Sequence, residues 1–330
     1  MKAVRVSAGE SESVRQKLLS ESALDTNRKL VKKNGFIEIP VMESFKTDEF
    51  FLFEQDRPEY YFQEKTLSSI LNIPDTEKKL LPRGWQVIGK IIIVTLNENL
   101  EHRKKEVGEA LLTLYPRCKT VLLDRGIIGR MREPLREIIA GSCTETIHKE
   151  NGCFFKLDTM RVMFSQGNLA EKKRMSRLGK DETVVDMFAG VGYFSIPMAV
   201  HSKPKKIISI EINPVSFGFL KENITLNRAG NIIVPIAGDC AEVTPCAIAD
   251  RVIMGYLDGH EYLPQGISAL LPGGILHYHE AVPEAIEQRP AERILDASKR
   301  HGRSAKIIGM HRIKKYAPGV WHVVVDARVD

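Results

Sequence analysis

The chain has 330 residues, of which 43% are hydrophobic and 27% charged, a composition typical of an ordinary folded protein with two or three domains. No apolar run approaches the roughly 18 residues of a membrane span, and the first residues lack the apolar segment of a secretory signal, so we expect no membrane partner. Its five cysteines are scattered and form no CxxC pair, which disfavours a zinc knuckle or a disulfide framework and favours a reduced, cytoplasmic setting. The net charge of +6 permits a nucleic-acid partner without requiring one.

The first half of the chain predicts two small α+β domains, at residues 1–75 and 80–175. In the first domain, residues 11–25 have the pattern of a helix and residues 35–41 that of a strand. Residues 71–84 hold prolines among charged side chains, and we expect a linker there. The second domain is expected to contain strands within 85–96 and 119–124, a helix at 102–116 and a strand pair within 154–165.

Residues 176–330 change to a regular alternation of strands and helices, which predicts an α/β fold. Strands are expected at 183–188, 206–212, 231–239, 250–257 and 273–280, and helices at 193–201, 214–227, 261–271 and 283–302. Strands separated by helices form a parallel sheet covered on both faces. The last two strands, 304–316 and 320–329, are joined by Ala-Pro-Gly, so they should form an antiparallel hairpin at one edge. A mostly parallel sheet with such a hairpin is the layout of a Rossmann-like class I S-adenosylmethionine (SAM) transferase domain.

The most informative run is VVDMFAGVGYFSIPMA, residues 184–199, which predicts a strand, a glycine-rich turn and the start of a helix. Open α/β sheets bind ligands at the carboxyl ends of their strands, where this turn lies. Gly190 and Gly192 let a ligand approach the backbone, but Ser195 stands where a dinucleotide fingerprint has its third glycine. Asp186 would repel a pyrophosphate and attract the ammonium of a methionine moiety. The turn therefore favours SAM, the alternative being a tight turn that binds nothing.

Two acids at the ends of the next strands extend this site. Glu211 is placed to accept hydrogen bonds from both ribose hydroxyls, and Asp239 to accept one from the adenine amino group. Without a ligand, each would be an ordinary carboxylate at a strand end. The predicted SAM site also includes Phe188, Ala189, Tyr193, Phe194, Ile212, Asn213, Cys240, Gly255 and Tyr256.

Basic residues flank the predicted α/β domain and are candidates for contact with a nucleic acid. They are Lys172, Lys173, Arg312, Lys314 and Lys315. Each cluster alone is more often a solvated face, but a nucleic-acid substrate would explain all of them together with the extra N-terminal domains. In the strand end HYHE, His277 and His279 should share one face, and we expect no metal site there.

Long collinear motifs carry a family resemblance. They are HKENGCFFKLDTMRVMFSQGN, VVDMFAGVGYFSIPMA, EINPVSFGFLKENITLN, DRVIMGYL, HYHE and KKYAPGVWHVVVD. Over residues 80–330 the chain resembles the archaeal and eukaryotic tRNA(Phe) aminocarboxypropyltransferases of wybutosine synthesis. It is similar, more distantly, to the tRNA guanine-N1 methyltransferases, whose small N-terminal domain residues 1–75 also resemble. The resemblance implies transfer of the 3-amino-3-carboxypropyl group of SAM to C7 of 4-demethylwyosine, at position 37 beside the anticodon of tRNA(Phe), with release of methylthioadenosine.

The motif after the fourth strand separates these two activities. The N1-methyltransferases carry Asn-Leu-Pro or Asn-Pro-Pro there, whereas this chain has Met-Gly-Tyr-Leu at 254–257, which disfavours methylation of a nitrogen. The family's general-base glutamate falls on Glu171, and the resemblance implies that Glu171 accepts the C7 proton while Ser165 and Arg174 contact the methionine carboxylate. A tRNA guanine37-N1 methyltransferase is the alternative, and an idle tRNA-binding module a third hypothesis that the SAM residues disfavour. We expect a monomer that binds the anticodon loop.

Overall fold

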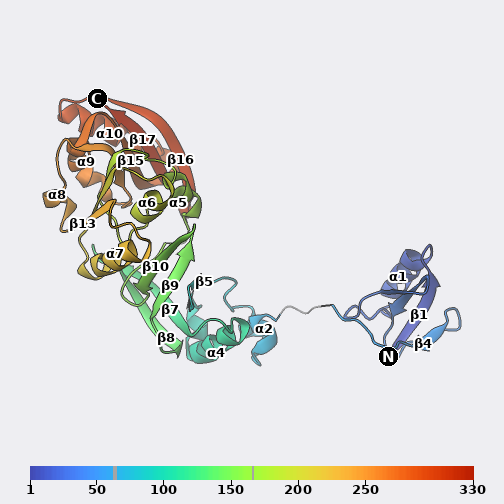
Figure 1. Ribbon diagram of the computed structural model, residues 1–330. Coiled ribbons are helices and arrows are strands. Elements are labelled where there is room, and N and C mark those ends of the chain that lie inside the picture. Colours follow the sequence, from blue (N-terminus) through green and yellow to red (C-terminus); the bar gives the residue numbers. More distant parts are fainter. Residues whose placement is uncertain (62–64, 166) are drawn as a thin grey trace. The chain divides into compact units, whose positions relative to one another are not determined.

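The computed structural model describes residues 1–61, 65–165 and 167–330. The chain divides into two compact units, Met1–Thr66 (unit 1) and Leu67–Asp330 (unit 2), which are described separately (Figure 1). Within the described residues, no helix is both long enough and apolar enough to cross a membrane.

Unit 1 is a small α+β fold built on a sheet with the strand order β2-β3-β1-β4. Its elements are β1 (Lys2–Ser7), α1 (Ser11–Ser20), β2 (Val31–Lys33), β3 (Phe36–Pro40) and β4 (Leu52–Glu54). Val14 and Leu18 lie four residues apart, so they share one face of α1. This face packs on Val4 and Ile39 of the two central strands. The predicted helix at 11–25 ends earlier, at Ser20.

Unit 2 begins with a second α+β region, built on the sheet β5-β6-β7-β8 and the hairpin β9-β10. Its elements are α2 (Leu67–Ile70), α3 (Asp75–Lys78), β5 (Gln86–Ile88), β6 (Ile91–Val94), η1 (Glu98–Arg103), α4 (Lys104–Leu114), β7 (Thr120–Ile128), β8 (Glu133–Gly141), β9 (Glu145–Glu150) and β10 (Cys153–Asp158). The expectation of a linker at 71–84 is wrong, because Leu71, Ile73 and Leu81 are buried in the core that α4 shares. These apolar residues are spaced irregularly among prolines and charges, so no periodicity reveals their packing.

Residues 154–165 also differ from the strand pair that their alternation predicts. β10 ends at Asp158, and its antiparallel partner is β9 rather than the residues that follow. Residues 159–165 form no further strand, although Val162 and Phe164 are buried against the α/β domain. The apolar alternation of this segment therefore reflects burial and not a second strand.

The remainder of unit 2 is a doubly wound α/β fold. Its elements are α5 (Leu169–Met175), β11 (Thr183–Asp186), α6 (Ser195–His201), β12 (Lys206–Glu211), α7 (Pro214–Leu226), β13 (Ile233–Ala237), α8 (Cys240–Val243), β14 (Ala249–Met254), η2 (Gly259–Tyr262), α9 (Leu263–Ala269), β15 (Leu270–Pro283), η3 (Glu284–Ile286), α10 (Arg289–Arg300), β16 (Ala305–Ala317) and β17 (Val320–Val329). The strand order is β13-β12-β11-β14-β15-β17-β16. β11 to β15 are parallel, whereas β17 is antiparallel to both β15 and β16. The predicted mostly parallel sheet with a C-terminal hairpin at one edge is confirmed.

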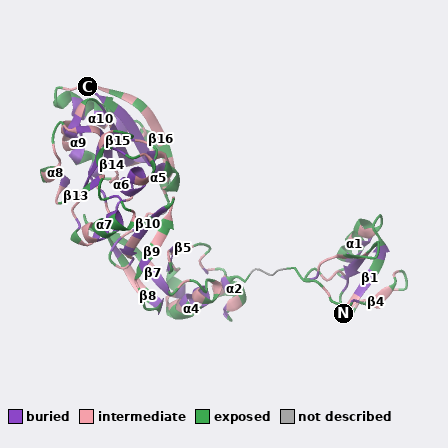
Figure 2. Ribbon diagram, viewed as in Figure 1, coloured by how far each residue is buried: buried purple, intermediate pink, exposed green. Residues whose placement is uncertain are grey.

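Helices cover both faces of this sheet because successive strand residues point to opposite sides (Figures 1 and 2). Val184 of β11 belongs to the core formed with α6 and α7, whereas Val185 belongs to the core formed with α9 and α10. These two cores fix the carboxyl ends of the parallel strands, which carry the predicted ligand-binding turns.

The strand end HYHE in β15 alternates as predicted. On one face the Tyr278 hydroxyl donates a hydrogen bond to Glu280 at 2.8 Å. On the other face His277 is hydrogen-bonded to Asp326 at 2.6 Å, and His279 to a histidine of β17 at 3.1 Å. The described residues contain no group of three His, Cys, Asp or Glu side chains arranged to hold a metal ion.

Candidate active site

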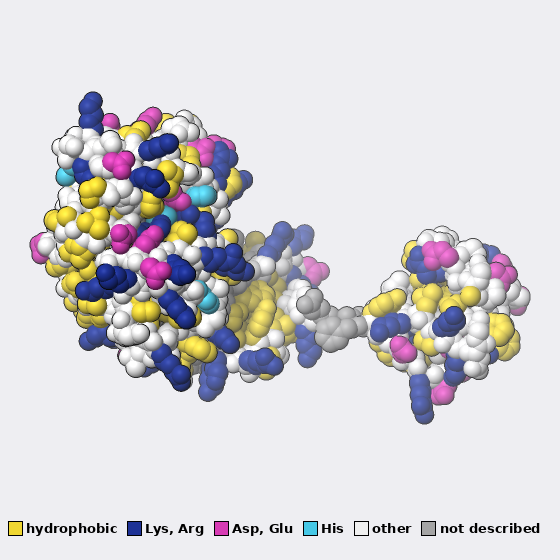
Figure 3. Space-filling view, turned by 45° about the horizontal axis from the view of Figure 1, so that its top comes forward, with side chains coloured by type: hydrophobic (Ala, Val, Ile, Leu, Met, Phe, Trp, Pro, Cys, Tyr) yellow, Lys and Arg dark blue, Asp and Glu magenta, His cyan; other side chains and the backbone are white. Residues whose placement is uncertain are grey.

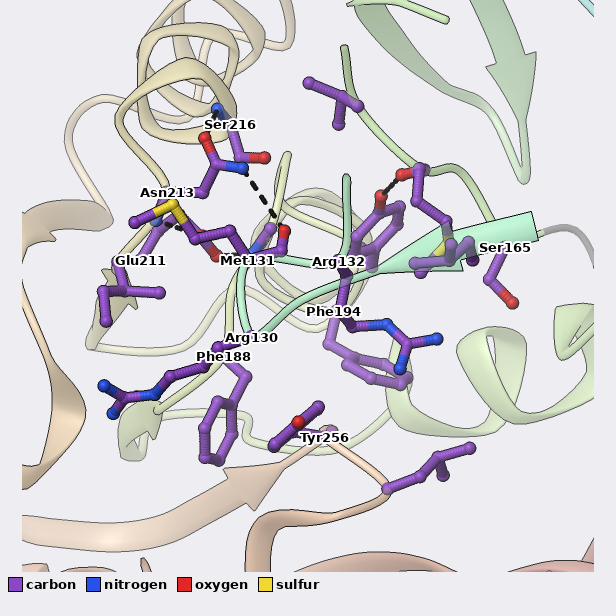
Figure 4. A pocket seen from close by; sticks show the side chains of 18 of the residues that line it. Arg130, Met131, Arg132, Ser165, Phe188, Phe194, Glu211, Asn213, Ser216 and Tyr256 are labelled. Carbon is purple, nitrogen blue, oxygen red and sulfur yellow. Dashed lines mark hydrogen bonds between the residues drawn. The ribbon is translucent and has the colours of Figure 1, made fainter. Parts of the chain in front are cut away.

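A cleft of about 420 Å³ lies at the carboxyl ends of the parallel strands of unit 2 (Figure 4). Its lining comes from the turns after β11, β12, β13 and β14, from the tip of the β7–β8 hairpin, from the β16–β17 hairpin and from residues 162, 163, 165, 167 and 168. This is the position where open α/β sheets bind ligands, and the volume lies in the range of small-molecule sites.

The glycine-rich turn after β11 forms part of this lining. Gly190 and Gly192 have φ angles of +57° and +100°, which residues with a side chain rarely adopt. A Cβ at Gly190 would also collide with the ring of Tyr193. Gly190 lines the cleft, whereas Gly192 is buried behind it. The turn thus requires glycine at both positions, for backbone conformation as much as for ligand approach.

Glu211 ends β12 and is fixed by the backbone around it. Its Oε2 accepts a hydrogen bond from the Gly190 N–H and its Oε1 one from the Asn213 N–H, both at 2.7 Å. Burial raises the pKa of this carboxyl group, and the backbone N–H donors partly oppose the shift. A carboxylate has about four lone-pair positions, so Glu211 can still accept hydrogen bonds from a ligand in the cleft.

Asp186 lies behind the turn and does not line the cleft. Its side chain is fully buried, and its Oδ2 accepts a hydrogen bond from the Ser195 hydroxyl at 2.6 Å. Burial raises the pKa of Asp186 to about 6. Asp186 was expected beside the ammonium of a methionine moiety. In the structure its carboxyl group connects the turn to Ser195, the first residue of α6.

Asp239 connects the sheet to the tip of the β7–β8 hairpin. Its Oδ1 accepts from the Ala241 N–H at 3.0 Å and its Oδ2 from Arg130 at 2.6 Å, and both contacts lower its pKa. Arg130 also donates to the Tyr262 hydroxyl at 2.7 Å. Arg130 was not predicted from the sequence, because 109 residues separate it from Asp239 and β8 was not expected. The only local signal was the basic, glycine-containing run DRGIIGRMRE.

Aromatic rings line the cleft after β11 and β14. The ring of Phe188 lies 5.4 Å from that of Tyr256 and 5.5 Å from that of Tyr262. A Cβ at Gly255 would lie 2.9 Å from the ring of Phe194, so this position must be glycine for that ring to stay in place. The motif after β14, which distinguishes the two activities in sequence, therefore faces the cleft.

The remaining predicted SAM residues divide between the cleft and the layer behind it. The cleft is lined by Ser165, Tyr193, Phe194, Ile212, Asn213 and Cys240. Ala189 is buried behind the turn. The Asn213 side chain accepts from the first N–H groups of α7 and donates to the Met131 carbonyl at 3.3 Å, which fixes the hairpin tip against the sheet (Figure 4).

Glu171 and Arg174 pair with each other on α5. The Arg174 guanidinium donates to both Glu171 oxygens at 2.7 and 2.8 Å and to Asp326 of β17 at 2.7 Å. Glu171 is 2% exposed, and neither residue is among the described residues that line the cleft. The Arg174 guanidinium, which was expected to bind the methionine carboxylate, is thus hydrogen-bonded to two carboxylates of the protein instead.

The predicted tRNA contacts have different surroundings. Lys172 is 1% exposed, and its ammonium donates to Glu150 at 2.8 Å and to the Ser165 carbonyl at 2.7 Å. Burial lowers the pKa of Lys172 despite the nearby Glu150. Lys314 lines the cleft, whereas the other three are exposed: Lys173, Lys315 and Arg312, which pairs with Glu287. Figure 3 shows Lys and Arg side chains spread over the visible face of unit 2 rather than gathered in one patch.

The doubly wound sheet, its C-terminal hairpin and the cleft at its strand ends define the class: a Rossmann-like transferase. Three family models match successive parts of the chain. They are the tRNA methyltransferase 5 N-terminal domain at 3–49, the TYW2 N-terminal domain at 65–144 and the TRM5/TYW2 methyltransferase domain at 146–307. The chain belongs to the TRM5/TYW2 family.

Two relatives differ in how much of the chain they match. The tRNA(Phe) (4-demethylwyosine(37)-C(7)) aminocarboxypropyltransferase of Methanocaldococcus jannaschii is 45% identical over 253 residues, which cover 74% of this chain and 98% of that protein. The tRNA (guanine(37)-N(1))-methyltransferase Trm5b of Pyrococcus abyssi is 35% identical, with 99% of both chains covered. The crystal structure of M. jannaschii TYW2 in complex with AdoMet matches with a TM-score of 0.62 and 40% identity, over 75% of this chain and 99% of that one.

Proposed function

We propose that this chain transfers the 3-amino-3-carboxypropyl group of SAM to C7 of 4-demethylwyosine at position 37 of tRNA(Phe), releasing methylthioadenosine. The observation that carries this proposal is the pair Gly255 and Tyr256 in the cleft. Neither side chain offers the amide that would hold the exocyclic amine of a guanine. The relative that is 45% identical bears the name of this same activity.

The proposed reaction is a displacement at carbon. The π electrons of C7 form a bond to the γ-carbon of the methionine moiety, and the bond from that carbon to sulfur breaks with its electron pair going to the sulfonium. Three carbons of SAM are activated in this way, so the protein selects the γ-carbon by holding it in line between C7 and sulfur. Position and alignment are therefore what the cleft has to supply.

We assign the nucleoside part of SAM to the strand ends. Glu211 accepts from the ribose hydroxyls, Asp239 from the adenine amino group, and the rings of Phe188 and Tyr256 contact the base. The methionine end extends toward Ser165 and toward Asn168, whose buried Oδ1 has no hydrogen-bond partner among the described residues. An unpaired buried carbonyl oxygen is suited to an N–H donor such as the methionine ammonium.

The assignments of Asp186, Arg174 and Glu171 to reacting groups stay predictions. Arg174 and Asp186 are each hydrogen-bonded to another side chain of this chain. In the structure they therefore hold α5 and the glycine-rich turn in place. Removal of the C7 proton by Glu171 would require its double hydrogen bond with Arg174 to open.

We propose tRNA as the partner, held at its anticodon loop. Lys173, Arg312 and Lys315 are the exposed candidates for phosphate contact, and Lys314 lines the cleft. Lys172 is omitted because it is buried and paired. We further propose a cytoplasmic monomer with three domains. The boundary between the first two, expected at residues 75–80, lies instead at Thr66, because Leu71 and Ile73 pack in the core that α4 shares.

The test is transfer of label from SAM to tRNA(Phe) that carries 4-demethylwyosine. SAM labelled in the carboxyl carbon is expected to label the tRNA, and SAM labelled in the methyl group is not. The matched acceptor is the same tRNA with an unmodified guanine at position 37. Methyl label entering that guanine, without carboxyl label in either tRNA, would replace this proposal with N1-methylation.

A further inference from the structure

Two buried histidines lie side by side next to the cleft. His279 of β15 and His322 of β17 are 1% and 3% exposed, and Nδ1 of His279 lies 3.1 Å from Nε2 of His322. The ring of Phe194 contacts His279, with 5.3 Å between the ring centroids. His322 lines the cleft together with Lys314, which is its partner residue on β16.

The second nitrogen of each ring has no hydrogen-bond partner within the described residues. These atoms are Nε2 of His279 and Nδ1 of His322. Buried polar atoms are nearly always hydrogen-bonded, so an unpaired nitrogen on a residue next to a cleft calls for an explanation, and a catalytic role is one of those that such atoms have. When Nε2 of His322 donates its proton to His279, Nδ1 of His322 carries a free lone pair.

The other basic groups in the cleft are already engaged. Glu211 accepts from two backbone N–H groups, and Asp239 accepts from a helix N-terminus and an arginine. Asp124 accepts from Arg136 at 3.1 Å. Glu171 does not line the cleft among the described residues, and both its oxygens are bonded. Glu211 and Asp239 are assigned to the nucleoside of SAM, and arginines hold Asp124 and Glu171. His322 therefore remains as a neutral base next to the cleft that no other role occupies.

We infer that His322 accepts the proton of C7 during the proposed transfer, with His279 positioning its ring. This inference rests on the proposed function. Once C7 has bonded to the γ-carbon and methylthioadenosine has left, the base is a cation with hydrogen and the new alkyl group on C7. The C7–H electron pair returns to the ring, and the proton moves to Nδ1 of His322, which becomes an imidazolium that donates to His279.

The surroundings keep His322 neutral before this step. Burial, and then the charge of Lys314, lowers the pKa of His322 to about 4. Burial also lowers the pKa of His279 well below its usual value. His322, then His277 and Arg174, add to the shift, and Asp326 opposes it. A base this weak is sufficient, because the alkylated base is a cation whose C7–H is strongly acidic.

The experiment measures single-turnover transfer of carboxyl-labelled SAM to tRNA with either hydrogen or deuterium at C7. We expect His322→Asn to slow transfer by about 100-fold, a usual size for loss of a general base. The dissociation constants for SAM and tRNA should stay unchanged. The wild type should show little or no deuterium isotope effect on transfer. His322→Asn should show a clear one, because proton removal from C7 becomes rate-limiting in that variant. Imidazole in solution should restore part of the rate of His322→Gly.

Matched variants distinguish His322 from Glu171, the other candidate for accepting the C7 proton. Glu171→Gln tests that acceptor, and His301→Asn, at the end of α10, is a histidine control that should behave as wild type. Full activity of His322→Asn, or an isotope effect that appears with Glu171→Gln instead, would overturn the inference. If the asparagine variant does not fold, His322→Gln takes its place. Absence of carboxyl transfer by the wild-type chain would instead remove the proposed function.

Discussion

At the scale of single residues, the molecule places ionisable side chains in its interior and shifts their pKa values in opposite directions. Burial raises the pKa of Asp186 to about 6 and lowers that of His322 to about 4. Both shifts favour the neutral form, because a charge loses hydration when it is buried. At neutral pH this leaves His322 unprotonated next to the cleft and able to accept a proton, whereas Asp186, which lies behind the turn, is mostly ionised.

These shifts predict a pH dependence of stability. In the unfolded chain His322 takes up a proton near pH 6.5, whereas in the folded chain it stays neutral down to about pH 4. The unfolded state therefore binds more protons in this window, and the residue destabilises the fold progressively as pH falls through it. We expect the free energy of unfolding of His322→Asn, relative to wild type, to rise by about 2 kcal/mol between pH 7.5 and 5.

Asp186→Asn is the control with the opposite sign. Folded Asp186 takes up its proton near pH 6 and the unfolded residue near 3.8, so wild type gains stability from this group as pH falls. Relative to wild type, Asp186→Asn should lose stability between pH 7.5 and 5. Denaturant unfolding at several pH values measures both, and parallel pH curves for the two variants and the wild type would contradict the burial of these groups.

At the scale of elements, the hairpin β7–β8 connects the α+β region of unit 2 to the cleft. Arg130 at its tip bonds Asp239 and Tyr262, and the Met131 carbonyl accepts from Asn213. These contacts cover the end of the cleft that we assign to adenine. The hairpin is thus a structural part of the ligand site, although it belongs to a different sheet.

We therefore expect Arg130→Ala to weaken SAM binding by about fivefold, the upper range for loss of an exposed ion pair. The loss should shrink at high salt, because such pairs are screened. Arg125→Ala is the matched control, since Arg125 lies on β7 of the same hairpin but pairs with Glu101 and Glu137. Calorimetric titration with SAM checks both variants. Equal affinities, or tighter binding by Arg130→Ala, would show that the hairpin does not hold the ligand.

How much of the site could be predicted from the sequence depends on how local each contact is. Gly190, Glu211 and Asp239 lie at or just after the ends of successive strands, so the β-α alternation alone placed them at one edge of the sheet. Arg130 comes from a hairpin more than 100 residues earlier, and no pattern in one sequence connects it to Asp239. The prediction of a linker at 71–84 was wrong for a related reason. Leu71 and Leu81 are buried by packing against α4, which their neighbours in the sequence do not reveal.

At the scale of the whole molecule, the two units carry unequal charge. Residues 1–66 contain eleven Lys and Arg against twelve Asp and Glu, so their net charge is −1. Because the whole chain carries +6, residues 67–330 carry a net charge of +7. Phosphate neutralisation supplies much of the affinity of proteins for nucleic acids and makes it salt-dependent. The electrostatic part of tRNA binding should therefore belong to unit 2, which also contains the cleft.

Removal of residues 1–66 tests this division. Unit 2 has its own cores, and the 45% identical aminocarboxypropyltransferase aligns over nearly its whole length while leaving about a quarter of this chain unmatched. We expect residues 67–330 to unfold cooperatively, to bind SAM as the full chain does and to transfer label at saturating tRNA within about twofold of its rate. The slope of log Kd for tRNA against log salt should be unchanged, because it counts phosphates neutralised by unit 2. A shallower slope in the shortened chain would assign phosphate contacts to unit 1 despite its net charge, through a local basic surface that its acidic residues do not cancel.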